Sequence, residues 1–421
     1  MNNSVEFKAT LRLPQIIALY VGSVLGSGIL IIPGVAAEIA GPASLISWGI
    51  MTLLVLPMAL TMGLLSAKYP NAGGVSSFVT DAFNPHIGSL IGWFFLMAVV
   101  VGAPVLALTG SGYLCTALGL GDKLRLSIAA AILLTGLLIN YFGMKLAGKI
   151  QIAVVLTTVI VLVTTIVSSI TTVKAENFIP FTPNGAESIG YATTVLFWCF
   201  IGWEAVSHIS IEFKNPKRDA IRGTIIAAIV VSIIYFFTAY IVVGTHSYGA
   251  NITDAALIYI IKNSFGLYGA VIAGAAALFI CVAPAIAYIG AASRLAYSLS
   301  INGYAPKSLS SLSRRYNTPT GGLIFLAVCF TFLLIIFAGR IATMSTLIQI
   351  PSAAFILTYL AGCAAGVKLL KDSKTGLFIS LVSLVLTAAI LFFAKWTIFY
   401  PIIIAIFWFI YCLIAKKFNR H

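Results

Sequence analysis

Two groups of glycine and polar residues lie inside long apolar stretches of this chain, and they are where its chemistry is most informative. The first is Gly26-Ser27-Gly28, and the second is the segment 197–204, which contains Gly202 and Glu204. Glycine lowers the cost of leaving helical geometry. A membrane helix tolerates a break at mid-depth only where the freed backbone groups line a cavity or hold a ligand. Two such breaks at matching places in two halves indicate the substrate site of a secondary transporter.

The first break can hold an anion. After Gly28 a new half-helix is predicted, and the start of a helix carries partial positive charge and unpaired N–H groups that suit a carboxylate. The alternative is a contact between helices through small residues, because Gly22 and Gly26 have the spacing of such contacts. We expect the carboxylate-binding groups to come from the residues around the break: Val24, Gly26, Ser27, Gly28 and Ile29.

Glu204 is the only carboxylate deep within an apolar span. A charged side chain at mid-bilayer costs about 2.5–3.5 kcal/mol on insertion scales, so such a residue is a functional candidate by default. A neutral and an anionic carboxyl differ greatly in solvation there, and Glu204 is therefore the predicted group for proton coupling. The alternative is a structural carboxyl that stays protonated or paired.

Two further side chains near Glu204 are candidates. Trp198 lies six residues before it, where an aromatic ring could close over a bound solute or contact it. His208 lies one helical turn beyond it and could join a proton route. The alternatives are a tryptophan that packs in the core and a histidine that is hydrogen-bonded and structural.

Composition places the chain in a membrane. Hydrophobic residues make up 60% of the 421 residues and charged residues only 9%, whereas roughly a quarter of the residues in a soluble domain are charged. A spanning helix needs about 20 apolar residues. The apolar stretches predict an all-α integral membrane protein with twelve transmembrane helices, at 13–39, 42–66, 86–117, 125–143, 147–171, 188–211, 223–245, 266–298, 321–338, 342–369, 375–393 and 396–415.

These spans form one membrane transport domain, 1–421, with internal symmetry. The first repeat is predicted at 13–171, the second at 188–369, and two accessory helices at 375–415. Because each repeat has five helices, an odd number, the second repeat is inverted. This arrangement favours alternating access, in which one bundle rocks against the other around a mid-membrane site.

The net charge of +14 is a topology signal. With the N-terminus inside, nineteen of the 25 Lys and Arg residues fall on the inner side of the predicted spans, as the positive-inside rule requires. We therefore expect no nucleic-acid partner, a multi-pass position in the cell membrane, and both termini in the cytoplasm. The six cysteines lie in apolar segments without metal-ligand spacing, so packing roles are expected, with no metal and no cofactor.

The broken segments resemble those of the amino acid–polyamine–organocation transporters. Residues 26–29 are similar to the glycine-rich unwound segment of that family, and residues 197–219 to its most specific stretch. A third similarity covers 293–298, 302–306 and 318–319. The similar segments occur in the same order as in the family and together span most of the chain. The stretch 197–219 is most similar to the bacterial amino-acid efflux branch, whose substrates include methionine and branched-chain residues.

The resemblance implies a fold and a set of contacts. The fold is the leucine-transporter five-plus-five inverted repeat with two added helices. The substrate carboxylate would meet the first break, its amino group would meet carbonyls near Trp198 and Ile201, and Trp198 would help to occlude the site. The third span would contribute Gly102, Ala103 and Leu106.

The sequence also departs from the family. Some proton-coupled relatives place a lysine in the middle of the fifth span, but 150–173 contains no charge. The eighth span, around 281–287, lacks the hydroxyl pair that sodium-coupled members use. The first departure removes the lysine as a coupling device, and the second argues against sodium. Proton coupling at Glu204, or exchange, is left.

The sequence thus predicts an amino-acid transporter and not an enzyme, because no catalytic constellation is present. The expected substrates are neutral apolar amino acids (methionine, leucine, isoleucine and valine), which would be exported by antiport with protons. The expected partners are the amino-acid substrate, protons and the lipid bilayer. An importer or exchanger of the same fold, or a channel, stays open as an alternative, and so does the oligomeric state.

Overall fold

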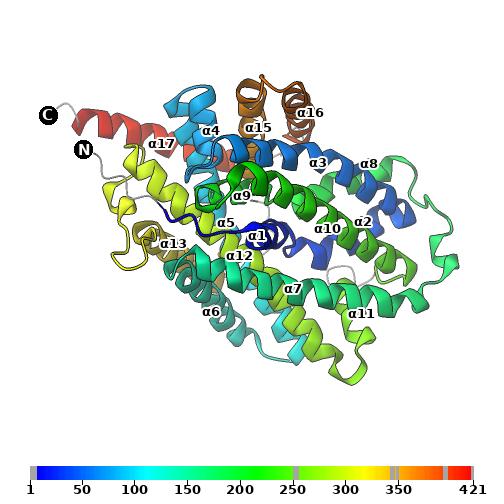
Figure 1. Cartoon of the computed structure of the whole chain (residues 1–421). Coiled ribbons are helices and arrows are strands. Elements are labelled where there is room, and N and C mark those ends of the chain that lie inside the picture. The colour runs from blue at the N-terminus through cyan, green and yellow to red at the C-terminus, as the bar shows by residue number, and fades with distance from the viewer. Residues whose placement is uncertain (1–6, 250–255, 342–346, 348–349, 392–396, 419–421) are drawn as a thin grey trace.

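The structure is a computed structural model that describes residues 7–249, 256–341, 347, 350–391 and 397–418. Within these residues the chain is helical, and an isolated bridge joins Leu11 to Phe213. Figure 1 shows the helices packed side by side. The α-helices are α1 (Leu13–Val24), α2 (Gly28–Ala40), α3 (Ser44–Lys68), α4 (Val75–Ala82), α5 (Pro85–Leu118), α6 (Asp122–Tyr141), α7 (Met144–Ser169), α8 (Glu187–Leu196), α9 (Trp203–Ser207), α10 (Pro216–Gly244), α11 (Ala256–Ser264), α12 (Gly269–Ile301), α13 (Thr320–Ala338), α15 (Ser352–Leu369), α16 (Lys374–Leu391) and α17 (Phe399–Phe418).

Ten helical segments of the described chain are long and apolar enough to cross a membrane. One of them, Gly28–Lys68, has 41 residues, and a straight helix of that length would be about 60 Å long, twice the hydrocarbon thickness. The chain turns within this segment at Gly41, whose φ is +59°. Two shorter apolar helices, Leu13–Val24 and Phe399–Ile414, accompany the ten. The all-α multi-pass architecture is confirmed, and the twelve-span count and the inverted repeat stay predictions.

Three of the predicted spans reach beyond the described residues. These are 342–369, 375–393 and 396–415, and each of them is described only in part.

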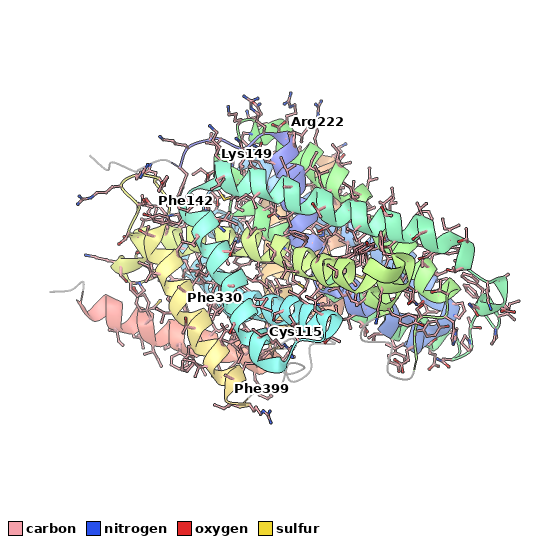
Figure 2. All side chains as sticks on the ribbon, turned by 90° about the horizontal axis from the view of Figure 1, so that it is seen from below. Cys115, Phe142, Lys149, Arg222, Phe330 and Phe399 are labelled. Atoms are coloured by element: carbon pink, nitrogen blue, oxygen red, sulfur yellow. The ribbon has the colours of Figure 1, made fainter. Side chains whose placement is uncertain are left out.

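Apolar side chains cover the outer faces of the helices. Ile160, Phe332 and Phe407 are each more than 60% exposed, as is Phe399, which is labelled in Figure 2. A soluble protein rarely exposes so many large apolar side chains, because their hydration is unfavourable. The exposed apolar surface is therefore suited to lipid.

The two longest helices, α5 and α12, pack along each other at the centre of the molecule. Glycine permits this approach, because a Cβ added at Gly110 would lie 2.8 Å from the Cβ of Cys281. Buried amides fix α12 from its other side. Asn140 Nδ2 donates to the carbonyl of Ile286 at 3.0 Å, and Gln151 Nε2 donates to the carbonyl of Ala283 at 3.1 Å. These contacts hold one wall of the central region in place.

The N-terminal segment before α1 is fastened to the chain that follows α9. The N–H groups of Thr10 and Leu11 both donate to the carbonyl of Glu212 at 2.9 Å, and the N–H of Lys214 donates to the carbonyl of Leu11 at 2.9 Å. The Glu212 carboxylate forms a buried ion pair with Arg294 of α12. The ring of Phe7 lies 5.6 Å from the Arg294 guanidinium. One end of the bundle is thereby closed by a polar cluster.

Candidate functional site

The first predicted break is present between α1 and α2. The N–H of Leu25 makes the last α-helical bond, and the N–H of Gly26 turns back to the carbonyl of Val24 at 2.8 Å. Helical bonding resumes when Ile29 donates to the carbonyl of Gly26. In the described chain the N–H groups of Ser27 and Gly28 donate no hydrogen bond to protein. The start of α2 therefore offers two unpaired donors together with the positive end of a helix.

The second break lies between α8 and α9 and is built differently. After the 3-10 helix η4 (Phe197–Phe200), Ile201 is extended and Gly202 has a φ of +139°, which glycine adopts without strain. The N–H of Gly202 donates to Glu204 Oε2 and to the Tyr359 hydroxyl, both at 3.0 Å. The N–H of Trp203 also donates to the Tyr359 hydroxyl at 3.0 Å. Protein groups therefore satisfy the N–H groups of Gly202 and Trp203 at this break.

The two breaks lie in direct contact. The hydroxyl of Ser23 on α1 lies 3.0 Å from the carbonyl of Gly202 and donates to it. A Cβ added at Gly202 would lie 2.6 Å from the backbone oxygen of Ser23, and one added at Gly28 would lie 2.8 Å from the Sγ of Cys199. Close approach therefore requires glycine on each of the two broken helices.

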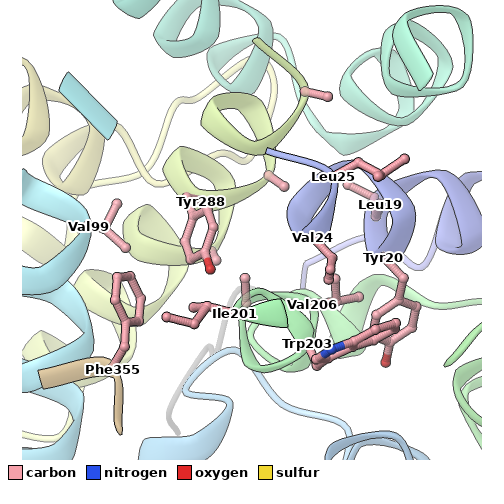
Figure 3. Close-up of a cluster of buried hydrophobic side chains, with 14 of the residues drawn as sticks. Leu19, Tyr20, Val24, Leu25, Val99, Ile201, Trp203, Val206, Tyr288 and Phe355 are labelled. Carbon is pink, nitrogen blue, oxygen red and sulfur yellow. The ribbon is translucent and has the colours of Figure 1, made fainter. Parts of the chain in front are cut away.

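A small cavity of about 50 Å³ lies between the breaks, α5, α12 and α15. It has room for a few water molecules, so its walls have to separate to admit a larger solute. Figure 3 shows Val99, Ile201, Tyr288 and Phe355 converging on this region from four different elements. The lining residues are Ser23, Val24, Gly26, Ser27, Gly28, Val99, Gly102, Ala103, Leu106, Trp198, Ile201, Pro284, Tyr288 and Phe355.

The structure brings together nine of the ten residues expected to contact the substrate. Ile29 is the exception, because it is fully buried on α2 and does not line the cavity. Five lining residues were not expected from the sequence; four of them lie in apolar stretches without a break, and Ser23 lies beside the first break. The nine are Val24, Gly26, Ser27, Gly28, Gly102, Ala103, Leu106, Trp198 and Ile201, and the five are Ser23, Val99, Pro284, Tyr288 and Phe355.

Glu204 is fully buried and does not line the cavity. The hydroxyl of Tyr288, which does line it, donates to Glu204 Oε1 at 3.1 Å. Among the described residues no basic side chain forms an ion pair with this carboxyl. The carboxyl therefore contacts a residue of the cavity wall through the hydroxyl of Tyr288, and it also accepts a hydrogen bond from the N–H of Gly202 within the second break.

His208 lies apart from the cavity. Its ring is fully buried, stacks on Phe95 at 4.3 Å, and lies where a Cβ at Gly74 would be placed. Phe95 also stacks with Tyr288 at 6.0 Å between ring centroids. The histidine therefore packs against Phe95, which in turn stacks on Tyr288, the hydrogen-bond partner of Glu204.

A helical membrane bundle whose two broken helices meet at a central cavity is the architecture of a secondary transporter. A family model described as amino acid permease matches residues 11–416. The chain therefore belongs to the amino acid permease family of the amino acid–polyamine–organocation superfamily, which confirms the resemblance seen in its motifs.

Several curated relatives cover most of the chain. It is 34% identical over 400 residues to an uncharacterized amino acid permease, YecA, of Bacillus subtilis, covering 95% of this chain and 94% of that protein. It is 32% identical over 369 residues to the L-methionine/branched-chain amino acid exporter YjeH of Escherichia coli, covering 86% and 87%. It is 25% identical over 320 residues to the branched-chain amino acid permease BcaP of Bacillus subtilis, covering 72% and 69%. These relatives are transporters rather than enzymes.

Proposed function

We propose that this chain exports neutral apolar amino acids, namely methionine, leucine, isoleucine and valine, across the cell membrane in exchange for protons. The observation that carries the proposal is a cavity without a charged lining residue that adjoins two unpaired N–H groups. The similarity to YjeH, an exporter of L-methionine and branched-chain amino acids, supports the choice of substrates and of direction.

The proposed substrate pose follows from the groups left unpaired. The N–H groups of Ser27 and Gly28 bind the carboxylate at the positive end of α2. The carbonyl of Ile201 accepts no hydrogen bond in the described chain and binds the amino group. The apolar side chain then packs against Leu106 and Phe355, with Trp198 closing the site. An uncharged wall disfavours cationic substrates, because it leaves a second positive charge unpaired.

Glu204 is the proposed proton carrier. Its carboxyl bonds to the N–H of Gly202 and to the hydroxyl of Tyr288, and both bonds change when it gains a proton. A neutral carboxyl is a weaker acceptor than a carboxylate. Protonation therefore weakens the hydrogen bonds that fix the N–H of Gly202 at the second break and the hydroxyl of Tyr288 in the cavity wall. We take the repeats 13–171 and 188–369 to rock about this site, with 375–415 accessory and both termini cytoplasmic.

Counterflow of labelled amino acids in proteoliposomes tests this function. We expect saturable exchange of methionine, leucine, isoleucine and valine, faster when a pH gradient is imposed, and little exchange of lysine or glutamate. Exchange that ignores the pH gradient would contradict proton coupling. A steady electrical conductance without counterflow would indicate a channel instead.

An importer or exchanger is the second candidate, because the similarity to BcaP, a branched-chain amino acid permease, supports the substrate class without a direction. The sign of the gradients sets direction in a carrier, so the two candidates share one site. Accumulation of labelled leucine in cells that express the protein, compared with cells that lack it, separates them. Lower accumulation supports export, and higher accumulation supports import.

A further inference from the structure

A polar pocket lies where α4, the start of α5 and the end of α12 meet, at the end of the bundle predicted to face the cytoplasm. Its volume is about 420 Å³, which has room for a small organic molecule. All of its lining residues except Pro85 and Leu299 carry a hydroxyl, an amide or a carboxyl group. It shares no lining residue with the central cavity. The polar pocket is therefore separate from the region proposed to bind the transported substrate.

Asp81 is the only charged residue that lines the polar pocket. In the described chain its carboxylate forms no ion pair, and burial raises the pKa of the carboxyl. Asp81 lies in the last turn of α4, which contains no basic residue. The C-terminal end of a helix carries partial negative charge, so a carboxylate is unfavourable there and a cation is favourable. The carboxylate and the helix end therefore attract the same kind of ligand.

Two serine hydroxyls in the lining are free to bind a ligand. Ser77 of α4 and Ser298 of α12 lie close together, because a Cβ added at Gly73 would lie against both hydroxyl oxygens. Neither hydroxyl makes a hydrogen bond within the described chain. The carbonyl of Asp81 also has no helical partner, because the residue four positions further on is Pro85, which has no N–H group. The polar pocket and the helix end beside it therefore hold several unpaired acceptors.

The lining of the polar pocket contains no basic side chain. An amino acid or a phospholipid headgroup would bring an anionic group together with its ammonium, and that anion would have no charged partner there. An amine that carries hydroxyls and no anion matches the chemistry of the lining. We propose that the polar pocket binds a small hydroxylated amine, whose ammonium group pairs with Asp81 and whose hydroxyls bond to Ser77 and Ser298. The proposal rests on the pocket alone and does not depend on the proposed transport function.

Glucosamine is the probe for this proposal, because it carries an ammonium group and several hydroxyls. We expect isothermal titration calorimetry to show saturable binding to the purified full-length protein, at a mildly acidic pH where the amine is protonated. N-acetylglucosamine keeps hydroxyls and lacks the charge, so it should bind about tenfold more weakly, as expected for the loss of a charge-assisted hydrogen bond. Failure of glucosamine to bind, or equal binding of the two sugars, would overturn the proposal.

Asp81→Asn removes the charge and keeps the size of the side chain. Because Asp81 is exposed and forms no ion pair in the described chain, the variant should fold, and its affinity for glucosamine should fall about tenfold. Glu38→Gln is the matched control, because Glu38 is an exposed carboxylate near the C-terminal end of α2 that does not line the polar pocket. Equal affinities in Asp81→Asn and the wild type would show that this carboxylate does not bind the amine.

Competition with leucine separates the polar pocket from the central cavity. Saturating leucine should leave the affinity for glucosamine unchanged, because the two regions share no lining residue. Displacement of glucosamine by leucine would place the amine in the central cavity and contradict the assignment to Asp81. Wild-type protein without amino-acid counterflow would refute the proposed function only, since the glucosamine titration requires no transport.

Discussion

The two helix breaks differ in how their freed N–H groups are satisfied. At the first break the N–H groups of Ser27 and Gly28 have no partner in the described chain. At the second break the N–H groups of Gly202 and Trp203 are bonded to Glu204 and Tyr359. An unpaired buried donor costs free energy, so the first break is suited to a ligand that comes and goes. At the second break the N–H groups of Gly202 and Trp203 are already bonded, and one of their acceptors is a titratable side chain.

The glycines at the breaks show the same contrast. A Cβ at Gly28 would meet Cys199 at 2.8 Å, and a Cβ at Gly202 would meet a backbone oxygen at 2.6 Å. A Cβ at Gly26 would be 3.6 Å from the nearest atom, in Pro284, which is ordinary contact. Gly28 and Gly202 therefore keep the breaks together, whereas Gly26 keeps space open beside the cavity.

Gly28→Val should have the largest effect, and it tests whether the first break binds the substrate. The branched side chain would push η4 away from the start of α2, so leucine binding should weaken by about 100-fold or more. Gly26→Val should also abolish binding, because it fills the space beside the cavity. Binding of labelled leucine to purified protein is the measurement, and Gly26→Ala is the control with a smaller loss. Near-normal affinity in both valine variants would remove the first break from the site.

Glu204→Gln should remove the ionisable carboxyl at the second break while keeping the size of the side chain. Glutamine resembles the protonated carboxyl, so exchange should persist at roughly a tenth of the wild-type rate and lose most of its pH dependence. The pH profile of leucine counterflow from pH 5 to 8, about the range set by proton-coupled transport, is the measurement. Glu38→Gln, which removes an exposed carboxyl at the far end of α2, is the control. A wild-type profile in Glu204→Gln would return this residue to a structural role.

Trp198→Ala is expected to act on occlusion. The indole lines the cavity from η4, and its loss should weaken binding about tenfold and speed leak of a preloaded substrate. Efflux of labelled methionine from proteoliposomes measures both. If affinity and leak are unchanged, the tryptophan serves only to pack the core.

Tyr288→Phe should have the smallest effect. It tests whether Tyr288 transmits the protonation state of Glu204 to the cavity. It removes the hydroxyl bonded to Glu204 Oε1 and keeps the ring in the cavity wall. Affinity should fall about threefold, near the low end of the range for a single hydrogen bond, while the pH profile shifts. A changed affinity with an unshifted profile would show that Tyr288 contacts substrate but does not transmit the state of Glu204.

The sequence predicted the breaks because each of them interrupts an apolar stretch with glycine and polar residues. A carboxylate inside a membrane span is rare and costly, and glycines grouped with polar residues ease departure from helical geometry, so 26–28 and 202–204 are visible without a structure. Phe355 and Val99 lie in ordinary apolar helices, and nothing local distinguishes them from core residues. Their place in the cavity wall depends on how α15 and α5 pack, which only the fold supplies.

The connections were less predictable than the spans. Helix α11 (Ala256–Ser264) lies between the predicted spans 223–245 and 266–298, where no helix was expected. At nine residues it is too short to show the length signal on which span prediction rests.

The strand-like pairing of the N-terminal segment with residues 212–214 has a practical consequence. Residues 212–214 begin five residues beyond the end of α9, and their hydrogen bonds fasten the N-terminal segment to the chain that follows the second break. Lys8 is exposed on that segment, and a spin label attached there would travel with the second broken helix. Pulsed distance measurements from this position to the start of α7 would follow the transport cycle in real membranes without altering a residue of the cavity.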